Sequence, residues 1–300
     1  MLLWSGVPCI IKKRSVMKAD LRVVNTSLIT EAIRDMCIEI NHDLSPDMKK
    51  ALSDATARET SPIGCRILGQ LQDNLRIAHD EMIPICQDTG MAVVFLDIGQ
   101  DVHLVGKDLT EAVNDGVRAA YTDGFLRKSV VSDPIERQNT TDNTPAVIHT
   151  SIVPGDRVTI RVAPKGFGSE NMSRVFMRKP AEGLEGVRDS ILTAVRDAGP
   201  NACPPMVIGV GIGGTFEKAA LMAKEALTRE VGCHSEKKWV ADLEVEMLDT
   251  INELGIGPGG LGGAVTALAV NIETYATHIA GLPVAVNICC HVNRHARREI

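Results

Sequence analysis

The sequence predicts an α/β or α+β protein in which helices surround a mixed β-sheet and the N-terminal region is helical. Three observations support this prediction. The first 80 residues carry apolar side chains at helical spacing, and two signatures of helix starts lie among them. Beyond residue 90, apolar runs of strand length alternate with amphipathic helical stretches. Aromatic residues are only 3% of the 300-residue chain, so the core must be built from Ala, Val, Ile, Leu and Met.

The first helix is expected at Ser27–Ile40, on whose buried stripe Cys37 falls. Ser45-Pro46 and Ser61-Pro62 each place a capping hydroxyl before a proline in the first turn, which predicts the starts of two further helices. Cys65 falls on the third helix. Because free cysteine is among the most buried residue types, we interpret Cys37 and Cys65 as core residues and not as metal ligands.

Strands and helices then alternate along the chain. The apolar run Met91–Ile98 predicts a strand, and Pro154-Gly155-Asp156 between two strand-like runs predicts an antiparallel hairpin. Polar, irregular stretches at 125–144 and 164–173 lie on either side of that hairpin, and long irregular loops in a compact domain are usually functional. The remaining expected elements are helices at 109–121, 186–198, 216–227 and 238–254, and strands at 206–210, in the run up to 272, and at 283–288.

Composition and charge exclude several classes of function. The net charge is −6, and the only basic runs are residues 12–14 and 294–298, which argues against nucleic-acid binding. No run of apolar residues approaches the length of a membrane span. The eight cysteines lack the dense pattern of a secreted disulfide scaffold, so we expect a cytoplasmic protein with free or metal-bound thiols. We interpret residues 1–16 as an N-terminal extension, with Met17 as an alternative start, and residues 17–300 as the functional domain.

Three cysteines stand where an apolar, strand-like run meets a turn: Cys86, Cys203 and Cys290. A four-iron cluster that transfers electrons is normally held by four thiolates. Three ligands would leave one metal corner free to bind a substrate oxygen as a Lewis acid. Cys289 adjoins Cys290, and successive side chains of an extended strand point to opposite faces. One cysteine of this pair should therefore not be a metal ligand.

Two other patterns suggest cofactors that we consider less well supported. Gly209–Gly214 has the spacing of a dinucleotide fingerprint, but the second strand with an acidic end that NAD binding requires is missing. These glycines would instead let backbone amides approach an anion or a cluster. Cys233-His234 resembles half a zinc site, yet its nearest cysteine partners are remote, which argues against structural zinc.

The residues near these motifs have more than one interpretation. Gln87 and Asp88 offer an amide and a carboxylate beside Cys86, or they form an Asx turn closing on the next two residues. His278 lies in an apolar stretch, as satisfied core histidines commonly do. Arg127 lies in an irregular polar loop, where it could bind an anion or simply be solvated. Spacing alone does not decide among these interpretations.

Taken together, these residues resemble the α subunit of a two-subunit class I (iron–sulfur) fumarate hydratase. The likeness covers nearly the whole chain from about Met17, and several long motifs in one order are more specific than any single one. The related L-tartrate dehydratase α subunit shares the cysteine motifs. The motifs are Ile85-Cys-Gln-Asp-Thr-Gly90, Thr141-Asp-Asn-Thr-Pro-Ala-Val-Ile-His149, Ala163-Pro-Lys-Gly-Phe-Gly-Ser-Glu-Asn-Met-Ser173, Gly199-Pro-Asn-Ala-Cys-Pro-Pro205, Gly209–Gly214 and Asn287-Ile-Cys-Cys-His-Val-Asn-Arg-His295.

The resemblance implies a [4Fe-4S] cluster held by Cys86, Cys203 and Cys290, with one iron open to substrate. It selects Cys290 over Cys289, because family members keep a cysteine directly before the position of His291. It also implies site residues that spacing left undecided. Asp88 and His278 become catalytic candidates, and the substrate-binding candidates are Gln87, Asp88, Arg127 and Gly168.

The resemblance also implies a partner. Single-chain members continue into a second domain that supplies the general base and further Arg and Lys contacts, whereas this sequence ends at Ile300. We therefore expect a separate β subunit and an α2β2 assembly. The expected reaction is the hydration of fumarate to malate, with dehydration of L-tartrate as the nearest alternative. An NAD-linked oxidoreductase and a non-catalytic iron–sulfur protein are the rivals from other classes.

Overall fold

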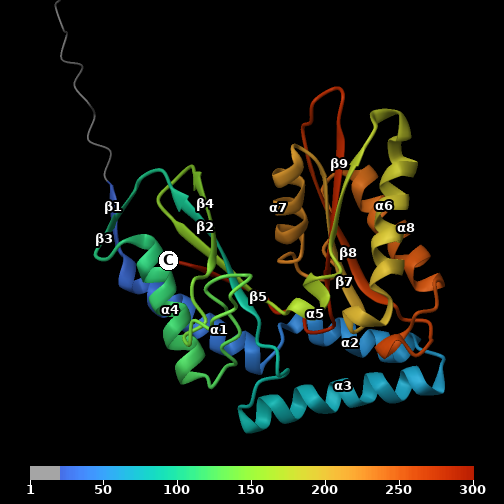
Figure 1. Cartoon of the computed structure of the whole chain (residues 1–300), viewed down its shortest axis with the longest axis horizontal. Helices are drawn as coiled ribbons and strands as arrows, with labels where there is room; N and C mark the ends of the chain where they lie inside the picture. Colours follow the sequence, from blue (N-terminus) through green and yellow to red (C-terminus); the bar gives the residue numbers. More distant parts are fainter. Residues whose placement is uncertain (1–20) are drawn as a thin grey trace, which may run out of the picture.

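The computed structural model describes residues 21–300, so the predicted extension at 1–16 lies outside the described residues. Two four-stranded mixed sheets stand side by side, and helices α2 and α3 lie beneath them (Figure 1). Each sheet has its own hydrophobic core, so the molecule has two lobes. The predicted class is confirmed, with two main sheets in place of one. Over residues 21–300, every helix is too short or too polar to cross a bilayer.

The first lobe is built on the sheet with strand order β10-β5-β2-β4. β2 is the central strand: it runs parallel to β4 and antiparallel to β5. Helices α1 and α4 pack on this sheet through buried Ile29, Ile33 and Val117, and a short parallel pair of strands, β1 and β3, adjoins them. The bounds are β1 Arg22–Asn25, α1 Thr26–His42, β2 Met91–Gly99, β3 Val102–Val105, α4 Leu109–Asp123, β4 Val147–Val153, β5 Val158–Lys165 and β10 Ala296–Glu299.

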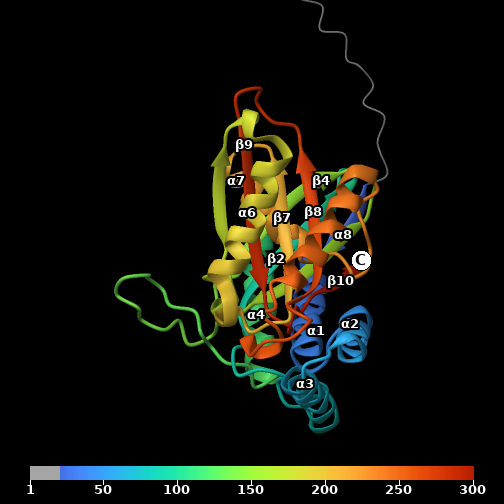
Figure 2. The ribbon, with the colours of Figure 1, turned by 90° about the vertical axis from the view of Figure 1, so that its right-hand side faces the viewer.

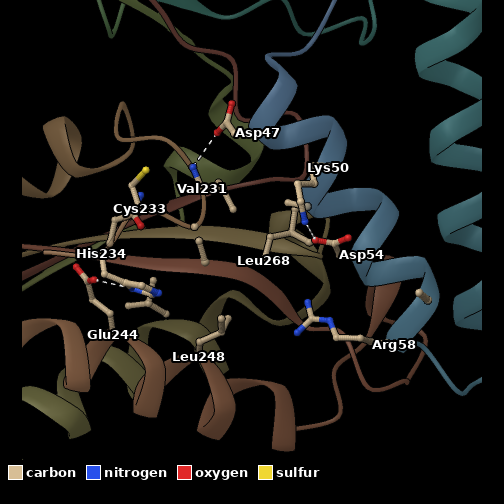
Figure 3. Close-up of a pocket in the computed structure, with 16 residues that line it drawn as sticks. Asp47, Lys50, Asp54, Arg58, Val231, Cys233, His234, Glu244, Leu248 and Leu268 are labelled. Atoms are coloured by element: carbon tan, nitrogen blue, oxygen red, sulfur yellow. Dashed lines mark hydrogen bonds and ion pairs between the residues drawn. The ribbon is translucent and has the colours of Figure 1, made fainter.

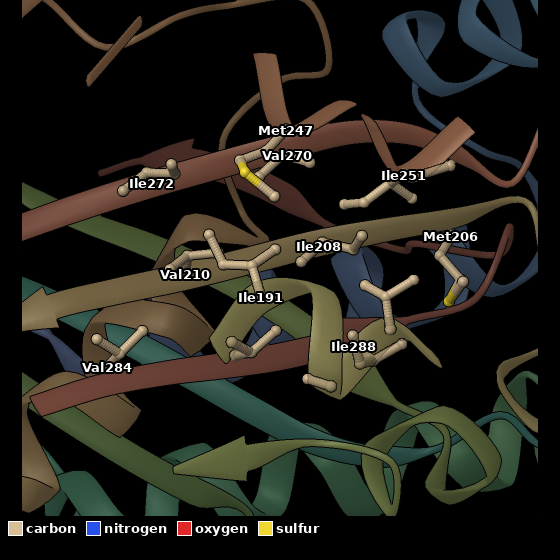
Figure 4. Packing of buried hydrophobic residues seen from close by; sticks show 14 of the residues in the cluster. Ile191, Met206, Ile208, Val210, Met247, Ile251, Val270, Ile272, Val284 and Ile288 are labelled. Carbon is tan, nitrogen blue, oxygen red and sulfur yellow. The ribbon is translucent and has the colours of Figure 1, made fainter. Parts of the chain in front are cut away.

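The second lobe is built on the sheet with strand order β6-β9-β7-β8. Helices α6 and α8 cover one face and α7 covers the face toward the first lobe (Figure 1). Figure 4 shows branched side chains such as Ile191, Ile208 and Ile288 filling the space beneath α6 and α8. The bounds are α5 Phe167–Glu170, β6 Arg174–Arg178, α6 Gly183–Ala198, β7 Met206–Gly213, α7 Phe216–Ala226, α8 Lys238–Glu253, β8 Ala267–Tyr275 and β9 Leu282–Cys289.

The two main sheets share one arrangement of strands, although β10 comes last in its sheet along the chain and β6 comes first, and the sequence shows no internal repeat. In each sheet the first strand (β2 or β7) leads through helix to a parallel neighbour (β4 or β8). The next strand (β5 or β9) then returns antiparallel on the other side of the first. The fourth strand of each sheet, β10 or β6, pairs antiparallel with that returning strand. Equivalent strand ends therefore lie at corresponding positions in the two lobes.

A third cluster of buried residues joins α2 (Pro46–Arg58) and α3 (Pro62–Glu81) to the second sheet, and it includes Met48, Leu52, Leu68 and Leu268. Both helices begin at the predicted Ser-Pro signatures. The Ser61 hydroxyl accepts a hydrogen bond from the backbone N–H of Gly64 (3.3 Å). The predicted cap by Ser45 is wrong, because its side chain makes no capping hydrogen bond.

The two cysteines of the helical region do not lie in one common site. Cys37 is fully buried on α1, and burial raises the pKa of its thiol to about 12, so its interpretation as a core residue is confirmed. Cys65 lies on α3 as predicted, is half-buried, and donates a hydrogen bond to the Glu59 carbonyl (3.3 Å).

The predicted antiparallel hairpin is wrong, because β2 lies between β4 and β5. β2 is apolar on both faces and almost wholly buried, which suits a central strand. The turn after β4 passes around the end of β2. There the backbone N–H of Gln100 donates to Val153 O (2.7 Å) and that of Asp101 donates to Gly155 O (2.9 Å).

The glycines of β7 serve helix packing, which corrects the expectation that they approach an anion or a cluster. A Cβ at Gly209 or Gly211 would collide with the backbone carbonyls of Ala223 or Ala219 on α7. Glycine therefore lets α7 lie directly on the sheet. The later residues Gly213 and Gly214 have positive φ in the turn before α7.

Glu59 ties the α2–α3 turn to the glycine-rich segment before β8. Only 6% exposed, its carboxylate accepts hydrogen bonds from four backbone N–H groups. Burial raises the pKa of Glu59, but these four donors outweigh burial and the net pKa is lowered. The donors and distances are Thr60 (2.9 Å), Ser61 (2.8 Å), Ala264 (3.0 Å) and Val265 (3.0 Å).

We expect Glu59→Gln to destabilise the fold by about 1–3 kcal/mol at pH 7, because the amide leaves buried N–H groups without an acceptor. Since the folded-state pKa is below the unfolded value, the carboxylate contributes its stability above the unfolded pKa of about 4.3 and loses it as pH falls further. Thermal unfolding at pH 7 and below pH 4 should show the deficit shrinking in acid. Glu81→Gln, at an exposed position on α3, is the control. An equal deficit at both pH values would contradict the charge argument.

Candidate functional site

The first cysteine of the candidate site lies on the segment between α3 and β2. Backbone contacts fix this segment: the N–H of Ile85 donates to Asn41 O, and the Asn74 amide donates to Ile85 O (both 2.9 Å). Cys86 follows directly and is half-buried, while Gln87 is exposed. The fold therefore presents the thiol and the amide side by side at the surface.

Asp88 links this segment to the turn after β5. Its Oδ1 accepts from the Gly90 N–H (3.0 Å), so the Asx turn is confirmed, and its Oδ2 accepts from the Phe167 N–H (3.0 Å). Gly168 lies in the short helix α5, which begins at Phe167; it is exposed and has open space where a side chain would be. Asp88 and Gly168 thus lie together at the surface, and we call the region around residues 86–90 and 166–168 the corner.

Arg127 is held against the same corner by its backbone. Its N–H donates to the Thr89 hydroxyl (2.9 Å), and that hydroxyl donates to Arg127 O (3.2 Å). Buried Asn143, at the other end of the irregular loop, donates from its amide to Gly90 O (3.1 Å). The Arg127 side chain is exposed and forms no ion pair with a carboxylate in residues 21–300. The predicted irregular loop extends from the body in Figure 2, and Arg127 comes near the start of this loop in the sequence.

Cys203 and Cys290 meet through His291. The His291 ring nitrogen Nδ1 lies 3.0 Å from Cys203 O, and because a carbonyl only accepts, Nδ1 carries the proton. Burial lowers the pKa of His291, so its imidazole is neutral near pH 7. Desolvation raises the pKa of the Cys203 thiol, and the charge of Cys86 raises it further. All three predicted ligand segments therefore lie in one region.

Cys289 and Cys290 both pack against the buried cluster beneath α2. Cys289 is 4% exposed, whereas Cys290 is half-buried just beyond the end of β9. The neighbouring Cys290 thiol lowers the pKa of Cys289, and the Cys289 thiol raises the pKa of Cys290. The choice of Cys290 as the ligand stays a prediction.

The three predicted ligands are thiols, the side chains that hold iron–sulfur clusters in proteins. In residues 21–300, no three His, Cys, Asp or Glu side chains are arranged to hold one metal ion. One zinc ion needs donors about 2.0–2.3 Å from a single point, whereas a four-iron cluster takes each thiolate at a separate corner. Two buried nitrogens beside the cysteines, Lys165 Nζ and Arg294 Nε, have no hydrogen-bond partner among the described residues. Both side chains carry a positive charge, which suits an anionic thiolate cluster.

Arg294 is a site residue that the sequence reasoning missed, since it was counted in a basic tail. It is 3% exposed, and its guanidinium donates to Asn41 Oδ1 (2.7 Å) and to Asp88 O (2.9 Å). Through these hydrogen bonds Arg294 fixes the position of the Cys86–Asp88 segment. Its position four residues after Cys290, within the last quoted motif, is the signal that could have identified it.

His278 is the one predicted site residue that the chain does not bring to the others. It is exposed in the loop between β8 and β9, where its Nδ1 accepts from the Ala280 N–H (3.1 Å). The eight residues of β9, roughly 26 Å of strand, separate this loop from Cys290. Exposure also contradicts the core interpretation of His278. Its catalytic role stays a prediction.

A cavity of about 830 Å³ between α2, β8 and α8 contains none of the predicted site residues. Figure 3 shows Cys233 and His234 at its edge, with the His234 ring turned toward Glu244. Glu244 is buried, and its carboxylate accepts from His234 (3.1 Å) and from the Ile272 N–H (2.8 Å), and pairs with Arg229. His234 and Arg229 are therefore used in structural pairing here.

A sequence model of the family described as "Fumarate hydratase (Fumerase)" matches residues 30–299. The chain belongs to the fumarate hydratase family. Within this family it is 40% identical to a Methanocaldococcus jannaschii protein named provisionally as L(+)-tartrate dehydratase subunit alpha, over 89% of this chain and 97% of that protein. It is 32% identical to the L(+)-tartrate dehydratase subunit alpha of Escherichia coli strain K12, over 89% of this chain and 88% of that protein. The resemblance predicted from the motifs is confirmed.

Proposed function

We propose that this chain is the cluster-bearing α subunit of a two-subunit hydro-lyase that hydrates fumarate reversibly to malate. Membership of the family supports the reaction class. The cofactor is supported by the three thiols, and Cys86, Cys203 and Cys290 would hold a [4Fe-4S] cluster. When bound, that cluster would supply an open iron acting as a Lewis acid toward a substrate oxygen, without a redox change.

The observation that carries this proposal is the meeting of three cysteine-bearing segments beside Asp88 and Arg127. His291 contacts the carbonyl of Cys203 at 3.0 Å, and Asp88 contacts the N–H of Phe167 at 3.0 Å. Residues remote in the sequence thus form one corner with thiols, an arginine and an open glycine turn. Such a combination is what a small dicarboxylate and a metal cluster would require together.

The chain's own residues would bind and orient the substrate. A dianionic substrate needs cationic partners, and the exposed Arg127 guanidinium can donate two parallel hydrogen bonds to one carboxylate. Its backbone is fixed by Thr89, which limits the entropy lost on binding. Gln87 offers an exposed amide donor, and the open space over Gly168 leaves room for the substrate beside Asp88.

A β subunit would supply the base that takes a proton from carbon, forming an α2β2 enzyme in the cytoplasm. Both carboxylate oxygens of Asp88 already accept backbone hydrogen bonds, so this side chain is used to hold the backbone. Large apolar side chains are exposed around the corner, including Phe125 (90%), Ile83 (45%) and Phe167 (48%). An exposed apolar patch of this kind suits a protein partner. The relatives' names, "subunit alpha", agree with a partner chain.

L(+)-tartrate is the second candidate substrate, because the relatives reported above carry that name. It differs from malate by one hydroxyl group. A polar group in the site that pairs with this hydroxyl would change the preference greatly, and the residues described here do not include an obvious one.

The test is to co-express the chain with its β subunit, purify the complex without oxygen, and assay both substrates. We expect kcat/KM for fumarate or malate to exceed that for L(+)-tartrate by about tenfold or more. The opposite ratio would assign the tartrate reaction instead. An iron-free complex that is inactive on both substrates after cluster reconstitution would refute the proposal.

A further inference from the structure

The short helix α5 lies among the three segments that carry the predicted cysteine ligands. Its first residue, Phe167, donates from its backbone N–H to Asp88 Oδ2 (3.0 Å) on the segment of the first cysteine. α5 also packs against β9, which leads to the third cysteine, and against the 3₁₀ turn Gly199–Ala202, which leads to the second. Whatever fixes α5 therefore fixes the place of Gly168 relative to the predicted ligands.

Glu170, the last residue of α5, anchors this helix to the second lobe. Its carboxylate forms an ion pair with Lys224 on α7, and its Oε2 accepts from the Asn287 amide on β9 (3.0 Å). The two charged side chains are only 24% and 16% exposed, so water screens this pair little. Burial raises the pKa of Glu170, but Lys224 and Asn287 outweigh burial and the net pKa is lowered. The carboxylate is therefore ionised at pH 7.

A second anchor joins the end of this turn to the same strand. Ser173 Oγ accepts from the Ile288 N–H (3.1 Å) and from the Asn287 amide (2.6 Å). The Ser173 N–H donates in turn to Glu170 O (3.0 Å). The Asn287 amide nitrogen therefore contacts both anchors, and Asn287 comes three residues before Cys290 in the sequence. These side chains join α5 to the strand that leads to a predicted ligand.

We propose that Glu170 is a positioning residue that acts through α5 and sets the size of the substrate space beside Gly168 and Asp88. This inference rests on the proposed function and deepens it. The space over Gly168 is open, but a Cβ at the neighbouring Gly166 would lie only 3.0 Å from Asp88 Oδ2, so α5 has little freedom to move closer. A displacement of α5 by about 1 Å would misplace a small substrate.

Glu170→Gln is the first test, made in the oxygen-free complex of this chain with its β subunit. The amide keeps the shape but loses the charge, and its NH2 group would face either Lys224 or the Asn287 amide, both of which are donors. We expect KM for fumarate to rise about tenfold, kcat to change less than about threefold, and the iron content to stay unchanged. Hydrogen exchange of the amides in residues 167–171 should become about tenfold faster.

Asn287→Asp combined with Glu170→Gln exchanges donor and acceptor across the same contact. The new amide then donates to the new carboxylate, which keeps one negative charge in the cavity of about 170 Å³ that Lys224 and Asn287 both line. KM should return to within about threefold of the wild type. Glu225→Gln is the matched control, because it removes an ion pair of α7 with Arg161 (3.3 Å) that does not involve α5. It should leave both KM and hydrogen exchange unchanged.

Ser173→Ala breaks the second anchor and keeps the ion pair, so it should raise KM by about threefold, and it decides the matter if Glu170→Gln does not fold. An unchanged KM in the folded Glu170→Gln variant, or in Ser173→Ala if that variant does not fold, would show that the positioning role is wrong while the proposed function stands. Iron loss in Glu170→Gln would also overturn it, because Glu170 would then support the ligands and not the substrate. If the wild-type complex acts on neither fumarate nor L(+)-tartrate, the proposed function fails first.

Discussion

Replacing Cys203 by serine should abolish iron binding and reduce the hydro-lyase activity of the α–β complex by more than about a thousandfold. Cys203 is exposed, so the change leaves no cavity in the core, and its backbone contact with His291 does not involve the thiol. Iron content and visible absorbance would therefore fall while the folded state is kept. We expect the same loss for Cys86→Ser and Cys290→Ser.

The matched controls are cysteines outside the predicted ligand set. Cys233→Ser changes an exposed thiol and should keep both iron and activity. Cys289→Ser should keep most of the iron, because its side chain faces the buried cluster beneath α2. Iron loss in Cys289→Ser together with retention in Cys290→Ser would exchange the assigned roles of the two neighbours.

The α chain alone should be nearly inactive even when its cluster is fully reconstituted, and adding the β subunit should restore turnover. No group in this corner is well placed to take a proton from carbon. Asp88 accepts two backbone hydrogen bonds, and His278 lies at the opposite end of β9. His291 is neutral and its Nδ1 holds the ring against Cys203 O, so only its Nε2 could accept a proton.

The measurement is the rate of fumarate hydration by anaerobic α chain before and after titration with purified β chain. Activity should rise with added β and saturate at a fixed ratio. Full activity without β would contradict the divided site. In that case His291, through its free Nε2, would be the first residue to test as the base.

The sequence predicted those parts of the fold that local patterns determine. Periodicity located α1 and α4, and the Ser-Pro signatures located α2 and α3 within a residue. Local patterns could not predict that β2 lies between β4 and β5. A short connection after β4 is compatible with a hairpin, and it is equally compatible with a turn that passes over Gly99 at the end of β2. The pattern of alternating Gly209 and Gly211 likewise fits a phosphate loop and a packed helix equally well.

The sequence indicated the candidate ligands of the site but not the buried residues around them. The cysteines stand out because a thiol at a strand end has few structural uses. Lys165, Glu59 and Arg294 do not stand out, since their partners are remote in sequence and only the fold makes them buried. His278 shows the opposite limit. It is close to Cys290 in the sequence, but the full length of β9 separates the two residues in space.

The three predicted cysteine ligands come from both lobes of the molecule. Cys86 lies on the segment that enters β2, while Cys203 enters β7 and Cys290 leaves β9, so one ligand belongs to the first lobe and two belong to the second. A group bound by all three is thus a cross-link between two separately cored bodies. Loss of the proposed cluster would therefore remove one link between the two lobes as well as stop the proposed reaction.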